Sequence, residues 1–204
     1  FRGIRHMTAF DADLPPIYGC TEPGVMMRPD FLAGAAELAR RSLSFDAWLF
    51  HPQLPELIAL ARALPDLRII TDHLAGPIGV GRYADDRAGA FAEWRRGMAE
   101  LATCPNVLVK IGALNMSFTA MAAEEDAPRP LSSAEMAQRQ RDHVLTAIEL
   151  FGPDRCMFES NFPVDKLLTS YRLVWNSFKR MTADLSTDER AALFAGTAAR
   201  CYGI

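Results

Sequence analysis

The chain contains 204 residues, of which 50% are hydrophobic and 23% are charged, and its formal net charge is −3. This length predicts a single domain over residues 1–204 that buries a substantial core. The charge balance leaves no basic surface for nucleic acid, and no apolar stretch approaches the roughly 20 residues that span a bilayer, so a small molecule is the expected partner.

The four cysteines, Cys20, Cys104, Cys156 and Cys201, are widely spaced and form no CxxC pair. This pattern indicates reduced thiols and a cytoplasmic protein. The chain starts at Phe1 rather than at an initiator Met, and its first residues read as the interior of a folded segment. We therefore expect that an amino-terminal part is missing. Self-association into a homo-oligomer is left open.

Short apolar segments alternate with segments of helical periodicity along the chain. Strands are expected at 1–7, 45–50, 67–71, 106–111 and 155–160. Helices are expected after an Asp30 cap, at 55–64, at 87–101, after the Ser132-x-x-Glu135 capping box, along an apolar stripe at 167–178, and after Ser186. Strict alternation, with strands apolar on both faces, predicts a parallel α/β sheet that is either doubly wound or part of a (β/α)8 barrel.

A long segment, 112–130, connects the fourth expected strand to the next helix. It holds Met116, Phe118 and Met121, followed by an acidic run and two prolines. Loops of this length without secondary structure of their own are usually functional or disordered. We interpret the segment as an excursion over the edge of the sheet, with a lid as one role.

Each expected strand ends in an ionisable or amide side chain. These strand-end residues are Arg5, His6, His51, His73, Lys110 and Asn161. The carboxyl ends of parallel strands share one rim, and α/β folds bind their ligands at that rim. The sequence therefore predicts a site there.

The residue types at the strand ends indicate what such a site would bind. His73 and His51 would ligate a metal or hydrogen-bond a substrate carbonyl, or else pack in their loops. Arg5 presents a planar fork suited to a carboxylate, with a salt bridge as the alternative. Arg5 and His6 cannot both point inward, because neighbouring strand residues face opposite ways. Lys110 would hold an anion or extend its amine to solvent.

An acidic cluster lies around the end of the last expected strand. Glu159 and Asn161 are expected on one face of that strand, with Glu159 one layer deeper and suited to act as a general base. The alternative for Glu159 is a structural ion pair with Lys110. Asp165 would be a second candidate base or an ordinary helix cap. His143 is expected on a solvated helix face.

Several motifs together resemble the amidohydrolase-related family, in the branch of 2-pyrone-4,6-dicarboxylate lactonases and sugar lactonases. The motifs are Gly3-Ile4-Arg5-His6, His51-Pro52-Gln53, Asp72-His73-Leu74-Ala75-Gly76, Val109-Lys110-Ile111-Gly112 and Met157-Phe158-Glu159-Ser160-Asn161-Phe162-Pro163. The segment 196–202 is similar to the closing helix of that family. The resemblance runs in order over nearly the whole chain.

The resemblance implies a (β/α)8 TIM-type barrel, of which this chain would form roughly the last five βα units. It implies that His73 binds substrate or metal and that Arg5 binds a substrate carboxylate or oxygen. The last strand of the family normally ends Ser-Asp-Trp-Pro, and its aspartate activates water, whereas this chain has Asn161. Because an amide cannot accept the water proton, either Glu159 or Asp165 takes that role, or Asn161 only orients the water.

No HxH pair occurs, so a complete metal site cannot be assembled from this sequence. If the missing part supplies such a pair, one divalent ion, zinc or manganese, would bind with His73 as a ligand. The main hypothesis is a hydrolase that opens a lactone or similar cyclic ester or amide of a small carboxylated or sugar-acid substrate. The alternatives are a metal-dependent decarboxylase of the same family and a barrel remnant that binds a small anion without catalysis.

Overall fold

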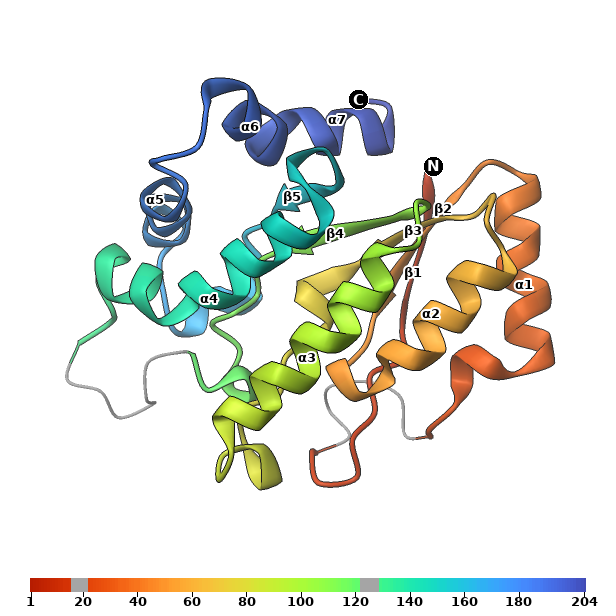
Figure 1. Ribbon diagram of the computed structural model, residues 1–204, viewed down its shortest axis with the longest axis horizontal. Coiled ribbons are helices and arrows are strands. Elements are labelled where there is room, and N and C mark those ends of the chain that lie inside the picture. Colours follow the sequence, from red (N-terminus) through yellow and green to blue (C-terminus); the bar gives the residue numbers. More distant parts are fainter. Residues whose placement is uncertain (16–21, 122–128) are drawn as a thin grey trace. The chain divides into compact units, whose positions relative to one another are not determined.

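The computed structural model describes residues 1–15, 22–121 and 129–204 (Figure 1). The chain divides into two compact units, residues 1–109 and residues 110–204, and each is described by itself. The expectation of one domain over 1–204 stays a prediction. Cys20 lies outside the described residues. No helix among the described residues is long and apolar enough to cross a membrane.

Five strands form one sheet in the order β1-β2-β3-β4-β5. Their bounds are β1 (Gly3–Met7), β2 (Ser44–Trp48), β3 (Arg68–Thr71), β4 (Val107–Ile111) and β5 (Cys156–Phe158). The first four pair in parallel, with Arg5 opposite Asp46 and Ile70 opposite Leu108. The predicted parallel α/β sheet is therefore confirmed.

The burial of each strand depends on what packs against it. Every residue of β2 and β5 is buried, as expected for parallel strands covered on both faces. The expectation fails for β1, where four of five residues are exposed, including Ile4 and Met7. The reason is that β1 packs chiefly against β2, whereas β5, at the other edge of the sheet, also packs against the helices at 133–151 and 197–202.

Three helices belong to the first unit: α1 (Pro29–Arg40), α2 (Leu54–Ala63) and α3 (Arg87–Ala102). Helices α2 and α3 pack side by side (Figure 1) and bury Leu57 and Trp94. The predicted Asp30 cap is wrong, because Pro29 takes the first helical position and Arg28 is the N-cap. Asp30 lies in the first turn, where its charge favours the positive end of the helix.

The second unit contains α4 (Ser133–Phe151), α5 (Tyr171–Met181), α6 (Thr187–Ala191), a π-helical turn (Ala192–Gly196) and α7 (Thr197–Tyr202). The capping boxes predicted at Ser132 and Ser186 both form. Leu167 was expected in the apolar stripe of a helix, yet its side chain is 87% exposed. It lies in a short turn that ends before Ser170, the residue that caps α5.

The segment 112–130 is more compact at its start than the sequence suggests. A 3-10 turn forms at Ser117–Thr119, and Phe118 and Met121 are buried. Residues 122–128 lie outside the described part, so the lid interpretation stays a prediction there. The three described cysteines form no disulfide and are buried, and burial raises the pKa of the Cys156 thiol to about 12.

Candidate functional site

The backbone after β3 forms a left-handed turn. His73, Leu74, Ala75 and Gly76 have φ angles of 56°, 54°, 56° and 46°. This conformation costs roughly 1–2 kcal/mol for each residue that carries a Cβ atom. The indole N–H of Trp94 in α3 donates to the Leu74 carbonyl at 2.8 Å, which helps to hold the turn. Strain of this kind persists only where surrounding structure enforces it, and it is common at functional sites.

The turn brings His73 to Arg5 of β1. The Arg5 Nη2 atom lies 2.8 Å from His73 Nε2, and Arg5 Nε lies 2.8 Å from the Asp72 carboxylate. Because a guanidinium only donates, His73 Nε2 must accept, and the neutral ring then carries its proton on Nδ1. The Asp72 side chain is fully buried, while that of Arg5 is 48% exposed. Arg5, Asp72 and His73 therefore form one cluster, with its cation open to solvent.

His6 and Lys110 lie elsewhere among the predicted residues. The His6 ring packs near Phe31 of α1, with 5.9 Å between ring centroids, on the opposite face of β1 from Arg5. In the second unit, the Lys110 amine lies over the Tyr202 ring, 5.5 Å from its centroid. Neither contact indicates a substrate role, so both assignments stay predictions.

His51 is buried on a 3-10 turn that follows β2. Its Nδ1 accepts a hydrogen bond of 3.1 Å from the Ile78 backbone N–H, so the neutral ring carries its proton on Nε2. The ring packs edge-on against Tyr83 with 5.0 Å between centroids. Burial raises the pKa of the Tyr83 hydroxyl, and the negative charge of Asp11 acts in the same direction. His51 therefore presents a hydrogen-bond donor at Nε2, opposite in polarity to His73 Nε2.

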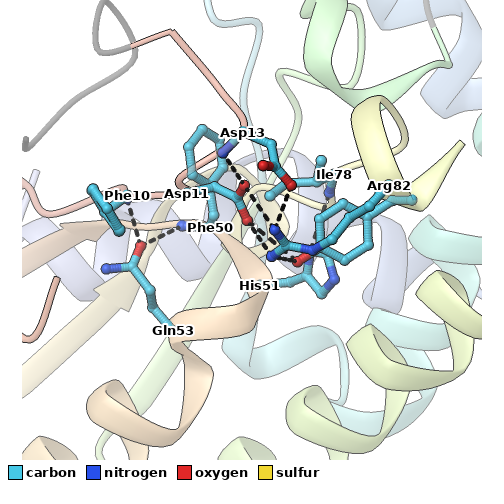
Figure 2. Close-up of polar contacts among 9 residues, drawn as sticks. Phe10, Asp11, Asp13, Phe50, His51, Gln53, Ile78 and Arg82 are labelled. Atoms are coloured by element: carbon cyan, nitrogen blue, oxygen red, sulfur yellow. Dashed lines mark hydrogen bonds and ion pairs between the residues drawn. The ribbon is translucent and has the colours of Figure 1, made fainter.

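A charged group beside His51 was not predicted from the sequence. Arg82 donates to the Asp11 carboxylate at 2.7 Å, to Asp13 at 2.6 Å and to the Tyr83 hydroxyl oxygen at 2.6 Å. Figure 2 shows the Arg82 guanidinium between the two carboxylates. Arg82 and Tyr83 lie in a 3-10 turn, Gly81–Tyr83, and no spacing in the sequence links positions 11 and 82.

Gln53 ties the loop after β1 to the end of β2 (Figure 2). Its Oε1 accepts from the backbone N–H groups of Phe10 at 2.8 Å and Phe50 at 3.3 Å. Its Nε2 donates to the Thr8 carbonyl at 2.7 Å. The His51-Pro52-Gln53 motif thus has a structural role in its last residue, which fixes the loop that carries Asp11.

In the second unit the strand ends earlier than predicted. Strand β5 stops at Phe158, and Asn161 has a left-handed backbone with φ of 53°. The expectation that Glu159 and Asn161 share one strand face is therefore wrong, because strand alternation has ended before residue 159. Glu159 is partly buried and its side chain packs against Gly112, where a Cβ atom would lie 2.5 Å from Glu159 Cγ.

Asp165 is the carboxylate that contacts Asn161. It is buried in a short 3-10 turn, Val164–Leu167, whose N-cap is Pro163, so its predicted role as the helix cap is wrong. Its Oδ1 accepts from Asn161 Nδ2 at 2.8 Å, and its Oδ2 accepts from Asn115 Nδ2 at 3.0 Å. Asn115 Oδ1 in turn accepts from Gln140 Nε2 at 3.0 Å.

The resulting chain of side chains, Asn161–Asp165–Asn115–Gln140, lies wholly within the second unit. Sequence reasoning found its first two members and missed Asn115 and Gln140. Nothing in the local pattern marks an amide as buried, and only the packing of α4 against the loop after β4 brings these two together.

Whether a metal ion fits depends on the donor side chains that the structure brings together. No group of three or more His, Cys, Asp or Glu side chains in the described ranges could hold a metal ion. His73 was the predicted ligand, but its Nε2 lone pair accepts the hydrogen bond from Arg5. A metal at that nitrogen does not fit, since the guanidinium occupies the same direction.

Comparison with known proteins assigns these features to a family. The profile described as amidohydrolase matches residues 1–204. The chain is 40% identical over 204 residues to the uncharacterized protein y4mH of Sinorhizobium fredii and 33% identical over 205 residues to an L-fucono-1,5-lactonase of Burkholderia multivorans. Both matches extend over 100% of this chain. The chain spans only 61% and 63% of the length of these two relatives.

A solved structure supports the same family. A crystal structure of an amidohydrolase from Burkholderia multivorans with bound zinc matches with a TM-score of 0.79 and 31% identity. The match covers 100% of this chain and 64% of that one. The structural neighbours of this chain are TIM-barrel amidohydrolases, in agreement with the predicted fold class.

Proposed function

Because the chain belongs to the amidohydrolase family, we propose that the protein is a hydrolase that opens a lactone of a small carboxylated or sugar-acid substrate. Relatives named L-fucono-1,5-lactonase support the lactone. The observation that carries the proposal is the hydrogen bond between Asn161 and Asp165, because it supplies a carboxylate beside the residue that stands where the family's aspartate would be.

Arg5 and His51 bind and polarise the substrate in this proposal. The half-exposed Arg5 guanidinium pairs with a carboxylate or ring oxygen of the substrate, and Asp72 and His73 hold its orientation. His51 offers the N–H of Nε2 to a carbonyl oxygen, where it stabilises the negative charge that develops during attack.

Asp165 is the proton acceptor in this proposal. Asp165 accepts a proton from water, and Asn161, whose Nδ2 is committed to Asp165, accepts a hydrogen bond from the same water through Oδ1. The water oxygen bonds to the lactone carbonyl carbon, and the ring C–O bond then breaks. The leaving alkoxide takes the proton back from Asp165, so the carboxylate is regenerated and the net change is addition of one water.

The test exchanges the carboxylate of Asp165 and the amide of Asn161 in the full-length protein. Asp165→Asn removes the only proton acceptor of this pair, so we expect kcat on a panel of sugar lactones to fall by at least about 100-fold. Asn161→Asp places two carboxylates side by side and is also expected to lower kcat. The double exchange, Asn161→Asp with Asp165→Asn, restores one carboxylate and one amide and is expected to recover part of the activity.

Matched controls make this result specific. Asp154→Asn removes an exposed carboxylate that pairs with Arg200 in the same unit, and it should leave kcat unchanged. Glu159→Gln tests the alternative base directly. If Asp165→Asn keeps the wild-type kcat, or if only Glu159→Gln abolishes it, the assignment to Asp165 is wrong. Mass spectrometry of the products separates hydrolysis, which adds water, from decarboxylation, which releases carbon dioxide.

A further inference from the structure

The direction of each hydrogen bond along the Asn161–Asp165–Asn115–Gln140 chain follows from one charge. An ionised carboxylate accepts but cannot donate, so Asn161 and Asn115 must both turn their Nδ2 groups toward Asp165. Asn115 then presents its Oδ1 in the other direction. That oxygen requires a donor, and the Nε2 group of Gln140 provides it.

The far end of this chain is buried in the fold. Gln140 lies in α4 with 1% of its surface exposed, and Asn115 is 4% exposed. A buried amide that lacks a partner for its donor or acceptor destabilises the folded state. The orientation of such amides is therefore strongly determined. A residue that is far from Asp165 in sequence therefore supplies the donor that Asn115 Oδ1 requires in this orientation.

We propose that Asn115 and Gln140 are positioning residues that hold Asp165 oriented toward Asn161 for the reaction. This inference rests on the proposed function for its catalytic consequence, while the polarity of the hydrogen bonds is independent of the substrate. Gln140 is the donor at one end of the chain, and Asp165 is the acceptor at the other.

The near-isosteric variant Gln140→Glu replaces the hydrogen-bond donor at residue 140 with an acceptor and leaves Asp165 unchanged. A glutamate carboxylate accepts, so Asn115 would have to donate to residue 140 and to Asp165 at once from opposite ends of its amide. Asp165→Asn removes the conflict, because an amide at 165 can donate to Asn115 Oδ1 and still accept from Asn161. In that double variant every hydrogen bond of the chain is satisfied: the two bonds of Asn115 have reversed polarity, and the bond from Asn161 to residue 165 keeps its direction.

A double-mutant cycle on stability tests the polarity without any substrate. We expect Gln140→Glu to raise the unfolding equilibrium constant roughly 100-fold in the wild-type background and at most about tenfold in the Asp165→Asn background. The control is Gln138→Glu, an exposed position on the same helix, which should show no coupling to residue 165. Equal effects of Gln140→Glu in both backgrounds would overturn the inference, whatever the enzyme hydrolyses.

Kinetics test the positioning role. Gln140→Glu is expected to lower kcat for lactone opening at least about tenfold while KM stays within about twofold, because substrate contacts are untouched and only the carboxylate is misaligned. Gln138→Glu should keep both constants. An unchanged kcat in folded Gln140→Glu protein would refute the positioning role. If the stability coupling appears but Asp165→Asn keeps the wild-type kcat, the assignment of Asp165 as the base fails and the polarity of the hydrogen bonds stands.

Discussion

Arg5 makes two hydrogen bonds that need both ends of its guanidinium fork. Its Nε pairs with Asp72 and its Nη2 pairs with His73, each at 2.8 Å. A lysine presents one compact ammonium group and cannot reproduce both contacts while also reaching a substrate. The geometry of this cluster therefore depends on arginine specifically, and not only on a positive charge at position 5.

Replacing Arg5 with Lys is expected to lower kcat/KM for lactone opening by about 10- to 100-fold, which corresponds to the loss of one charge-assisted hydrogen bond. The measurement is steady-state kinetics of the purified variant. Arg68→Lys, at the exposed amino end of β3, is the control and should have little effect. Equal constants for Arg5→Lys and wild type would show that Arg5 does not contact the substrate.

The left-handed turn after β3 is the element that places His73. Gly76 closes it with φ of 46°, and a Cβ atom there would lie 2.7 Å from the Leu49 carbonyl oxygen and 3.0 Å from Phe50. The backbone therefore approaches the end of β2 more closely than any side chain would allow. Gly24 has a similar left-handed conformation, with φ of 72°, but nothing lies within 4 Å of its missing Cβ atom.

Alanine substitutions at these two glycines distinguish the cost of a left-handed backbone from the cost of a steric contact. Gly24→Ala should cost roughly 1–2 kcal/mol of unfolding free energy, the usual cost of a left-handed residue with a Cβ atom. Gly76→Ala should cost more, because the contact with Leu49 and Phe50 forces the turn to move, and it should also weaken catalysis. Urea unfolding of both variants gives the comparison. Equal losses would mean that the close approach at residue 76 relaxes freely.

The stability of the whole molecule should depend on His143. Burial lowers the pKa of its imidazole to about 4, and Asp142 opposes this only in part. The unfolded chain, with a pKa near 6.5, binds this proton at higher pH than the folded chain does. The unfolded state is therefore favoured as the pH falls below 6.5, and the loss levels off below about 4. The sequence predicts a solvated face here, and the structure shows the His143 side chain as partly buried.

We expect wild-type protein to lose about 2 kcal/mol of unfolding free energy between pH 7.5 and pH 5 through this group alone. His143→Gln removes the titration and should reduce the total loss by that amount. Urea unfolding at the two pH values measures it. Parallel losses in wild type and variant would contradict the burial of the imidazole.

The sequence by itself determined the alternation of strands and helices, the parallel sheet and the two capping boxes. These features depend on local periodicity and on side chains three residues apart, and both are visible in the sequence alone. It also placed His51 and His73 after strands, because apolar runs stop there, whereas Arg5 lies within β1 and Asn161 lies beyond the end of β5. Family resemblance followed from the same motifs.

Only the tertiary structure decided which of these residues meet and how each is oriented. The bond between Arg5 and His73 depends on a left-handed turn that no sequence pattern announces, and it is this bond that makes His73 Nε2 an acceptor. The placement of Asn115 and Gln140 around Asp165 depends on packing between α4 and a loop distant in sequence. Hydrogen-bond direction is a property of the folded network, since each amide must satisfy two neighbours at once.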